Sequence, residues 1–404
     1  MIEFEEATLR GVLESHARTR PSAPALLSTE HSSLSYAQLA AAADHAQDWL
    51  ASLGLDASAR IAVLLPTGLP LALATVVVAC NATVLPLHPG LTPRELETLL
   101  CDARVDAILG APGSEVVGTL AQQLGVQALS FDLARLMHAA ADRPAVRGGR
   151  HAAPAPGDTA FVLFTSGTSG KPKRVPLTQQ QVLASARNIA RHLAIAPDDR
   201  GLLVMPTYHG HGLIGGLLTP LVAGSSVACT PSFDTSAFVQ WLTEFDPTWY
   251  TAAPSIHQAI VDIAAQRTSA WPAHRLRFTR SASSALPTAL LRDLEALWQA
   301  PMIESYGMTE TSTQMTSNPL PPGIRIAGSV GPAAGAQIRV IDEHGHDRPC
   351  NAEGRVVVRG PAVFSGYEDA PALNKEAFHD GWFITGDLGR LAADGYLYIS
   401  GRTS

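Results

Sequence analysis

The chain has 404 residues, of which 46% are hydrophobic and 16% are charged, so it is long and apolar enough to bury more than one domain-sized core. Its formal net charge of −7 provides no general attraction to nucleic acid or to an anionic membrane. We therefore expect neither nucleic acid nor a membrane among its partners.

The cysteines and the N-terminal residues bear on the cellular compartment. The four cysteines lie far apart and form no CxxC pair, so they predict neither a disulfide framework nor a zinc site. The N-terminus, MIEFEEATLR, is acidic, whereas a signal peptide begins with basic residues. We expect a cytoplasmic protein.

The first part of the chain alternates short β-branched runs with longer helical patterns. IAVLL is followed by the helical LALATVVVACNA, then by the strand-like TVLPL and the helical TPRELETLLCDA. This alternation predicts βαβ units on a parallel sheet. The apolar run at 61–80 is interrupted by Pro66, Gly68 and Pro70, so we interpret it as a strand, a turn and a helix and not as a membrane span.

The later part of the chain has two further patterns. Residues 141–158 are rich in proline and glycine and predict a linker, after which strands and helices alternate again. Beyond the second α/β stretch the pattern changes to short strands and turns, such as AQIRVID, GRVVVRG and YLYIS. We expect an α/β fold with two βα-layered subdomains, 1–150 and 151–325, and a smaller β-rich subdomain, 326–400.

The segment FVLFTSGTSGKPKRVPLT contains two of the only three lysines among 29 lysine and arginine residues. Its glycines let backbone N–H groups approach an anion, while its hydroxyl and ammonium groups add donors and positive charge. This composition suits a polyphosphate; a Gly/Ser/Thr surface hairpin is the simpler alternative. The spacing is not that of the P-loop, because Pro172 follows Lys171 where that motif requires a hydroxyl residue.

Four motifs occur along the chain: TSGTSGKPK, ESYGMTE at 304–310, TGD at 385–387 and GR at 401–402. Together they resemble the adenylate-forming superfamily of acyl-CoA synthetases, luciferases and nonribosomal-peptide adenylation domains. The resemblance implies the large N-terminal domain of these enzymes as the fold. It implies that ATP converts a carboxylate to an acyl-adenylate and pyrophosphate, and that the acyl group then passes to a thiol.

The resemblance also implies which residues bind the nucleotide. Tyr306 would stack on adenine, and Asp387 and Arg402 would bind the ribose. Small residues of the SASSALP segment would lie beneath the adenine. The implied set is Thr165, Ser166, Gly167, Thr168, Ser169, Gly170, Lys173, Ser284, Ala285, Tyr306, Thr309, Asp387 and Arg402.

ATP and Mg²⁺ are the cofactors that the resemblance implies. Lys173 would bind the β- and γ-phosphates with the preceding loop, and Thr309 would donate to the α-phosphate. Glu310 would hold the metal, because a hard cation prefers oxygen ligands. These three residues and His209 would act in catalysis.

The resemblance places the acid beside the HGHG segment. His209 would gate the carboxylate and His211 would face the acyl group. The two histidines have no further ligand nearby in sequence, so we do not expect a metal there. The implied pocket consists of His209, His211, Gly212, Ser283, Gly307, Met308 and Thr313.

The substrate is expected to be a small carboxylic acid. MPTYHGHGLIGG, RSASSALP and MTETSTQMTSNPLPPG are most similar to oxalyl-CoA synthetases and related small-acid ligases. Thr313 stands where those enzymes carry a histidine, so a second substrate carboxylate would lack a cation at this position. A small monocarboxylic or hydroxy acid is therefore as plausible as oxalate.

In the superfamily the chain continues past GR into a lid domain with a catalytic lysine, and residues 401–404 would begin the hinge to it. We expect the 404-residue chain to form adenylate about 10²–10³-fold more slowly without that lysine. The thiol would be CoA or the phosphopantetheine of an acyl or peptidyl carrier protein.

Two other functions are alternatives to such a ligase. One is a nucleotide-binding pseudoenzyme or interaction module, and the other is an adenylate-consuming oxygenase.

Overall fold

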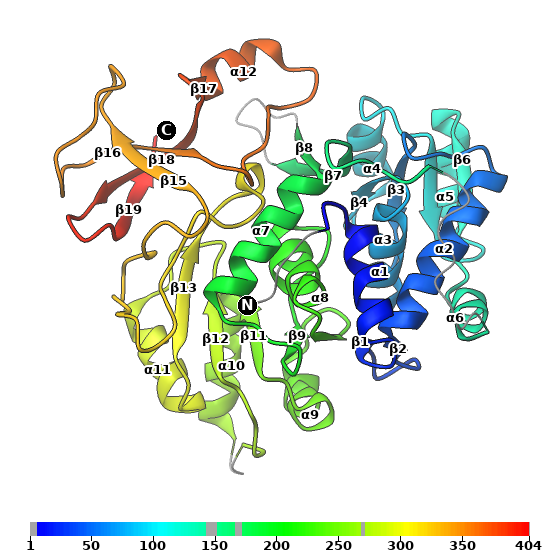
Figure 1. Ribbon diagram of the computed structural model, residues 1–404, viewed down its shortest axis with the longest axis horizontal. Helices are drawn as coiled ribbons and strands as arrows, with labels where there is room; N and C mark the ends of the chain where they lie inside the picture. Colours follow the sequence, from blue (N-terminus) through cyan, green and yellow to red (C-terminus); the bar gives the residue numbers. More distant parts are fainter. Residues whose placement is uncertain (1–5, 143–151, 166–171, 268–270, 404) are drawn as a thin grey trace.

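The computed structural model describes residues 6–142, 152–165, 172–267 and 271–403. It contains three sheets (Figure 1). Two mainly parallel sheets with their helices stand side by side, and a smaller antiparallel sheet lies at one end of the larger one. The predicted α/β architecture with a β-rich part is confirmed.

The six-stranded sheet has the order β6-β5-β3-β4-β7-β8 and is parallel except between β7 and β8. Its strands are β3 (Arg60–Leu64), β4 (Thr83–Pro86), β5 (Ala107–Gly110), β6 (Gln127–Ser130), β7 (Thr159–Thr165) and β8 (Lys173–Thr178). The helices in this half are α2 (Tyr36–Ser52), α3 (Leu69–Ala79), α4 (Pro93–Leu100), α5 (Glu115–Leu124) and α6 (Leu133–Ala141).

The eight-stranded sheet has the order β14-β13-β12-β11-β9-β10-β1-β2, with antiparallel pairs only at its two edges. Its strands are β1 (Pro24–Leu27), β2 (Leu34–Ser35), β9 (Arg200–Leu203), β10 (Ser226–Cys229), β11 (Trp249–Ala252), β12 (Phe278–Ser281), β13 (Met302–Tyr306) and β14 (Thr316–Ser317). Helix α1 (Leu9–Thr19) packs mainly against α2. The helices of the eight-stranded half are α7 (Gln179–His192), the π-helix η1 (His211–Leu218), α8 (Thr219–Val222), α9 (Thr235–Phe245), α10 (Pro254–Gln266), α11 (Thr288–Trp298) and the 3₁₀ turn η2 (Thr309–Thr311).

The third sheet is antiparallel throughout and has five strands. These are β15 (Gln337–Ile341), β16 (Gly354–Arg359), β17 (Phe378–His379), β18 (Trp382–Leu391) and β19 (Leu397–Arg402), with helix α12 (Pro371–Ala377) before β17. Arg402 pairs with Asp387 in this sheet. Residues 401 and 402, expected at the start of a hinge, therefore belong to β19.

The two larger sheets exchange strands across the expected boundary at residue 150. β1, near the N-terminus, pairs in parallel with β10 of the eight-stranded sheet, whereas β7 pairs with β4 of the six-stranded sheet through Val84 and Phe161. The division into 1–150 and 151–325 thus separates segments of the chain but not the two sheets. Half of the expected linker 141–158, residues 143–151, lies outside the described residues.

Local sequence signals begin several helices. Ser35, Thr92 and Thr178 are N-caps of capping boxes that start α2, α4 and α7, because each hydroxyl accepts from an otherwise unpaired N–H group. α3 begins at Leu69 with Pro70 in its first turn and is buried from Leu71 to Ala79. The apolar run is thus a strand, a turn and a buried helix, as predicted, and in the described part of the chain no helix is long and apolar enough to span a bilayer.

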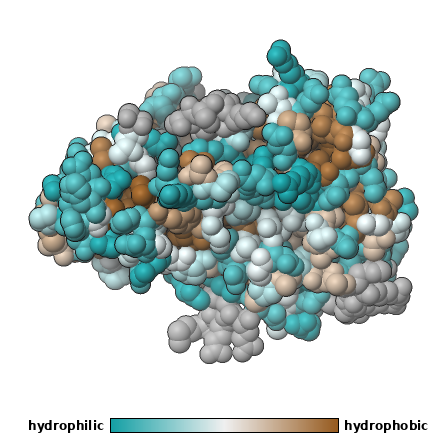
Figure 2. Space-filling view, turned by 90° about the horizontal axis from the view of Figure 1, so that it is seen from above, coloured by the Kyte–Doolittle hydropathy of each residue, from teal (hydrophilic) through white to brown (hydrophobic). Residues whose placement is uncertain are grey.

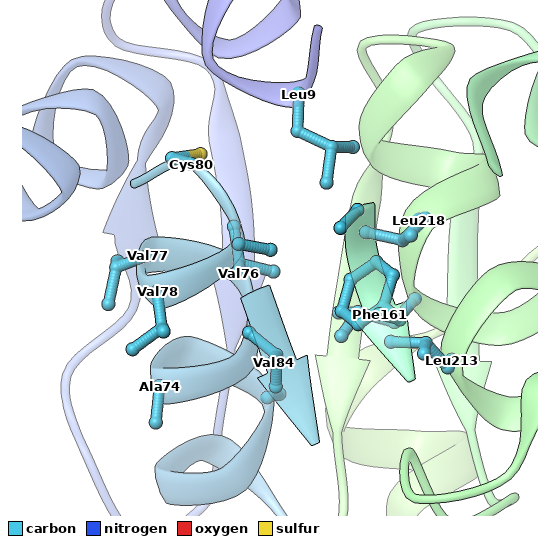
Figure 3. Close-up of a cluster of buried hydrophobic side chains, with 14 of the residues drawn as sticks. Leu9, Ala74, Val76, Val77, Val78, Cys80, Val84, Phe161, Leu213 and Leu218 are labelled. Carbon is cyan, nitrogen blue, oxygen red and sulfur yellow. The ribbon is translucent and has the colours of Figure 1, made fainter. Parts of the chain in front are cut away.

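A large apolar core joins the two halves of the molecule. Figure 3 shows Val76 of α3 with Val84 of β4 and Phe161 of β7, all from the six-stranded half, and Leu213 and Leu218 of η1 beside Phe161. These side chains are at most 2% exposed. Seen from above, hydrophobic residues on the surface form separate patches between larger hydrophilic areas (Figure 2).

Replacing Phe161 by alanine tests how far the molecule depends on this core. Removal of a fully buried ring leaves a cavity, so we expect the free energy of unfolding to fall by about 3–5 kcal/mol, which lowers the urea midpoint. Val116→Ala is the control: Val116 is 41% exposed, and we expect a change within about 0.5 kcal/mol. Equal midpoints for the two variants would contradict this account of the core.

Candidate functional site

A cavity of about 760 Å³ lies where strand ends from all three sheets meet. It is bordered by the end of β7 and the start of β8, by the segments that follow β12 and β13, and by β18 and the end of β19. Ends of parallel strands are the usual ligand sites of such sheets. Among the predicted residues, the cavity is lined by Thr165, Lys173, His209, His211, Ser283, Gly307, Met308, Thr309, Glu310, Thr313 and Arg402.

Thr165 and Lys173 flank the glycine-rich loop. The predicted phosphate-binding residues Ser166, Gly167, Thr168, Ser169 and Gly170 lie outside the described residues. The hydroxyl of Thr165 is buried and has no hydrogen-bond partner in the described part of the chain. A buried hydroxyl without a partner is costly, so this atom is available to a ligand oxygen.

Asp387 is held between Tyr306 and Arg402. Its carboxylate accepts hydrogen bonds from the Tyr306 hydroxyl at 2.5 Å and from Arg402 Nε at 2.8 Å. The Asp387 carboxylate raises the pKa of Arg402. The pKa of Tyr306 is raised mainly by burial and, to a smaller extent, by the negative charge of Asp387. The structure therefore brings together the three residues predicted to contact base and ribose, of which Arg402 belongs to the cavity lining and Tyr306 and Asp387 do not.

Glu310 is a buried carboxylate on η2. It is 4% exposed, and Oε1 accepts a hydrogen bond from the Tyr367 hydroxyl at 2.7 Å. Burial, and then the negative charge of Glu310, raises the pKa of Tyr367, so the phenol stays protonated and remains a donor. No group of three or more His, Cys, Asp or Glu side chains in the described residues could by itself hold a metal.

Tyr367 is a site residue that sequence reasoning missed. The Nζ atom of Lys173 lies 5.0 Å from the centroid of its ring, within the range of cation–π attraction. The following residue, Glu368, forms ion pairs with Arg60 at 2.8 Å and with Arg174 at 3.2 Å. These pairs tie the Tyr367 segment to the six-stranded sheet; in the sequence, a tyrosine after a glycine carries no signal of this contact.

The two predicted histidines differ in their surroundings. His209 packs edge-on against Tyr208, with ring centroids 4.8 Å apart, and burial lowers its pKa. His211 is 7% exposed and lies between two hydroxyls, with Nδ1 2.8 Å from Ser283 Oγ and Nε2 2.6 Å from Thr251 Oγ1. Burial, followed by the charge of a nearby arginine, holds the pKa of His211 well below its ordinary value. Both rings are therefore neutral at pH 7.

Gly307 allows two segments at the cavity to approach closely. A Cβ atom at this position would lie 2.0 Å from the carbonyl oxygen of Thr313, so a larger residue would push the wall apart. Gly212, Ser284 and Ala285 were also predicted to contact ligands, yet they are absent from the cavity lining. Their contacts with ligands stay predictions.

Comparisons with known proteins agree over nearly the whole chain. A family profile described as AMP-binding enzyme matches residues 13–368. The oxalate–CoA ligase of Arabidopsis thaliana is 35% identical over 411 residues, covering 99% of this chain and 80% of that protein. The sulfoacetate–CoA ligase of Cupriavidus necator is 36% identical over 405 residues, covering 98% and 78%.

A solved structure gives the same picture of the fold. ATP-bound MatB from Rhodopseudomonas palustris superposes with a TM-score of 0.84 at 28% identity, covering 96% of this chain and 78% of that one. The resemblance to adenylate-forming enzymes, and within them to ligases of small acids, is thereby confirmed.

Glu304, on the strand that leads to the site, makes the stability of the folded protein depend on pH. It lies on β13, is 6% exposed and accepts a hydrogen bond from the Gly328 amide at 3.2 Å. Burial raises its pKa from 4.5 to about 7. Between pH 4.5 and pH 7 the folded state therefore binds more protons than the unfolded state. Protonated Glu304 contributes fully to the free energy of unfolding below pH 4.5, and this contribution is lost as the pH rises through 7.

Glu304→Gln should remove this dependence. At pH 8 we expect the variant to exceed the original protein in free energy of unfolding by up to about 3 kcal/mol, with little difference at pH 4.5. The measurement is urea unfolding over this pH range, with Glu343→Gln as control because Glu343 is 86% exposed. A pH-independent difference between Glu304→Gln and the original protein would refute the assignment.

Proposed function

Because the chain belongs to the AMP-binding enzyme family, we propose that it uses ATP to activate a small carboxylic acid and that the acyl group then passes to the thiol of CoA. The observation that carries this proposal is the gathering of Arg402, Glu310 and Lys173 around one cavity, with Asp387 hydrogen-bonded to Arg402. In the proposed reaction, Asp387 would accept the ribose hydroxyls beside its cationic partner Arg402, Glu310 would hold the metal, and Lys173 would bind phosphate.

The reaction has two steps. In the first, a carboxylate oxygen attacks the α-phosphorus of ATP, the bond between the α-phosphorus and the bridging oxygen breaks, and pyrophosphate leaves. In the second, the sulfur of the thiol attacks the acyl carbon, the thiol loses its proton, and AMP leaves. The phosphopantetheine of a carrier protein presents the same thiol as CoA and is the second acceptor that we consider.

The nucleotide would lie along the cavity from Asp387 to Lys173. Asp387 accepts hydrogen bonds, as two ribose hydroxyls require, and Tyr306 beside it presents a ring to the base. Thr309 would donate to the α-phosphate. Lys173 and the hydroxyl of Thr165, which has no partner among the described residues, would serve the other end of the site, where the β- and γ-phosphates need donors and positive charge.

Glu310 suits a magnesium ion that also binds ATP. Mg²⁺ prefers one or two carboxylates together with phosphate oxygens and water, and Glu310 has one carboxylate oxygen, Oε1, committed to Tyr367. When bound, the ion would neutralise phosphate charge during the attack at phosphorus. Glu310 would hold it, and the Tyr367 hydroxyl would fix the orientation of that carboxylate.

The acid would bind where His209, Ser283 and Thr313 line the cavity. A neutral His209 neither repels nor permanently binds the carboxylate, which is consistent with a gating role. Oxalate and sulfoacetate, named for the relatives, are small acids with a second anionic group. A pseudoenzyme is disfavoured because the charged residues at 173, 310, 387 and 402 are all retained.

Lys173→Gln tests the phosphate end of the site. Loss of a charge-assisted contact should weaken binding of a non-hydrolysable ATP analogue by about 10- to 100-fold, with AMP affinity little changed, in isothermal titration calorimetry. Lys375→Gln is the matched control, since Lys375 lies on α12 and is not a lining residue. Equal losses for ATP analogue and AMP, or an unchanged affinity for both, would contradict the assignment.

Tyr367→Phe tests the support of Glu310. Without the hydroxyl, the carboxylate loses a fixed hydrogen bond, and we expect the magnesium concentration for half-maximal pyrophosphate exchange to rise by about 10-fold. The melting temperature should change little. Tyr398→Phe, on β19 outside the cavity lining, is the control; an unaltered magnesium requirement in Tyr367→Phe would remove this residue from the site.

A further inference from the structure

Arg280 is a fully buried positive charge without an acidic partner in the described part of the chain. It lies on β12, is 0% exposed, and donates from one terminal nitrogen to Thr251 Oγ1 at 2.9 Å and from the other to Gln314 Oε1 at 3.1 Å. Its Nε has no partner among the described residues. Burial lowers its pKa only to about 10, so it remains charged at pH 7. Burying a charge without an acidic partner is costly, and this cost points to a role for Arg280 at the site.

A line of hydrogen bonds connects Arg280 to the cavity. Thr251 Oγ1 lies 2.6 Å from His211 Nε2, and His211 Nδ1 lies 2.8 Å from Ser283 Oγ. Ser283 lines the cavity and has a φ of +80°, a left-handed conformation that is strained for serine and is typical of functional sites. The backbone is therefore held in an unfavourable state that keeps this hydroxyl beside His211.

The direction of these hydrogen bonds depends on one proton. Arginine can only donate, so Thr251 Oγ1 accepts from Arg280. The neutral ring of His211 carries a single N–H group. If that proton is on Nδ1, Nε2 accepts the Thr251 hydrogen, Nδ1 donates to Ser283 Oγ, and the Ser283 hydrogen is free to point into the cavity. If it is on Nε2, Ser283 must donate to Nδ1 and presents only lone pairs.

The charge of Arg280 favours the first arrangement. A hydroxyl that accepts from a guanidinium becomes a stronger donor, because hydrogen bonds in a chain polarise one another. The same positive charge also disfavours a proton on the histidine nitrogen that faces Thr251. Both effects put the His211 proton on Nδ1, next to Ser283.

We propose that Arg280 is a positioning residue that acts through Thr251 and His211 to make Ser283 a hydrogen-bond donor facing the cavity. The site then selects acids whose second group is an anionic acceptor, such as a carboxylate or a sulfonate. This inference rests on the proposed function. The positive charge of Arg280 would then act at the acid end of the cavity, where Thr313 itself provides no cation.

The first test reads the tautomer of His211 in the unaltered protein. In protein with ¹⁵N-labelled histidine, NMR should show the His211 proton on Nδ1 and a bare Nε2, with the signals assigned by comparison with His211→Asn. A proton on Nε2 would overturn the inference. Binding of a non-hydrolysable ATP analogue, measured on the same sample, separates the two proposals: its absence argues against the function, whereas binding with the wrong tautomer argues only against the role of Arg280.

The second test measures selectivity in the full chain. Malonate and propionate differ by a carboxylate in place of a methyl group, and we expect malonate to be preferred. Thr251→Val should raise the KM for malonate by about ten-fold and leave the KM values for propionate and ATP within about two-fold; Thr251→Ser, which keeps the hydroxyl, should restore the original value. Preference for propionate, or equal changes for both acids, would overturn the inference. If Thr251→Val does not fold, the NMR result on the unaltered protein decides.

Discussion

Repulsion between anions is the constraint around which this site is organised. The proposed reaction brings a carboxylate to a triphosphate, and water would screen their charges only if the site were open. The chain instead places two cations at one cavity. Arg402 is held by Asp387, and Lys173 lies against the Tyr367 ring. Preorganised groups of this kind stabilise developing charge without having to reorient during the reaction.

No single sheet could supply these groups. Lys173 comes from the six-stranded sheet, Glu310 from the segment after a strand of the eight-stranded sheet, and Asp387 from the antiparallel sheet. Ion pairs of Glu368 with Arg60 and Arg174 connect the antiparallel part to the six-stranded sheet. The Tyr367 hydroxyl then joins the same segment to Glu310. Relative placement of the three sheets thus determines the geometry of the site.

Features that depend on residues close together in the sequence were predictable, and contacts between residues far apart in the sequence were not. The strand–turn–helix at 61–80 follows from local chemistry, and the four motifs indicated the family. The exchange of β1 and β7 between sheets was missed because strand partners are chosen by packing over the whole core. Tyr367 and Arg280 were missed for a similar reason: their partners, Glu310 and Thr251, lie far away in sequence. The roles of individual site residues remain predictions, and the central part of the phosphate loop lies outside the described residues.

The most direct measurement is a crystal structure of the chain with magnesium and a non-hydrolysable ATP analogue. Our account predicts the ribose at Asp387, the metal on Glu310 and the terminal phosphates between Thr165 and Lys173. A nucleotide bound outside this cavity, or inside it with Glu310 away from the metal, would contradict the account.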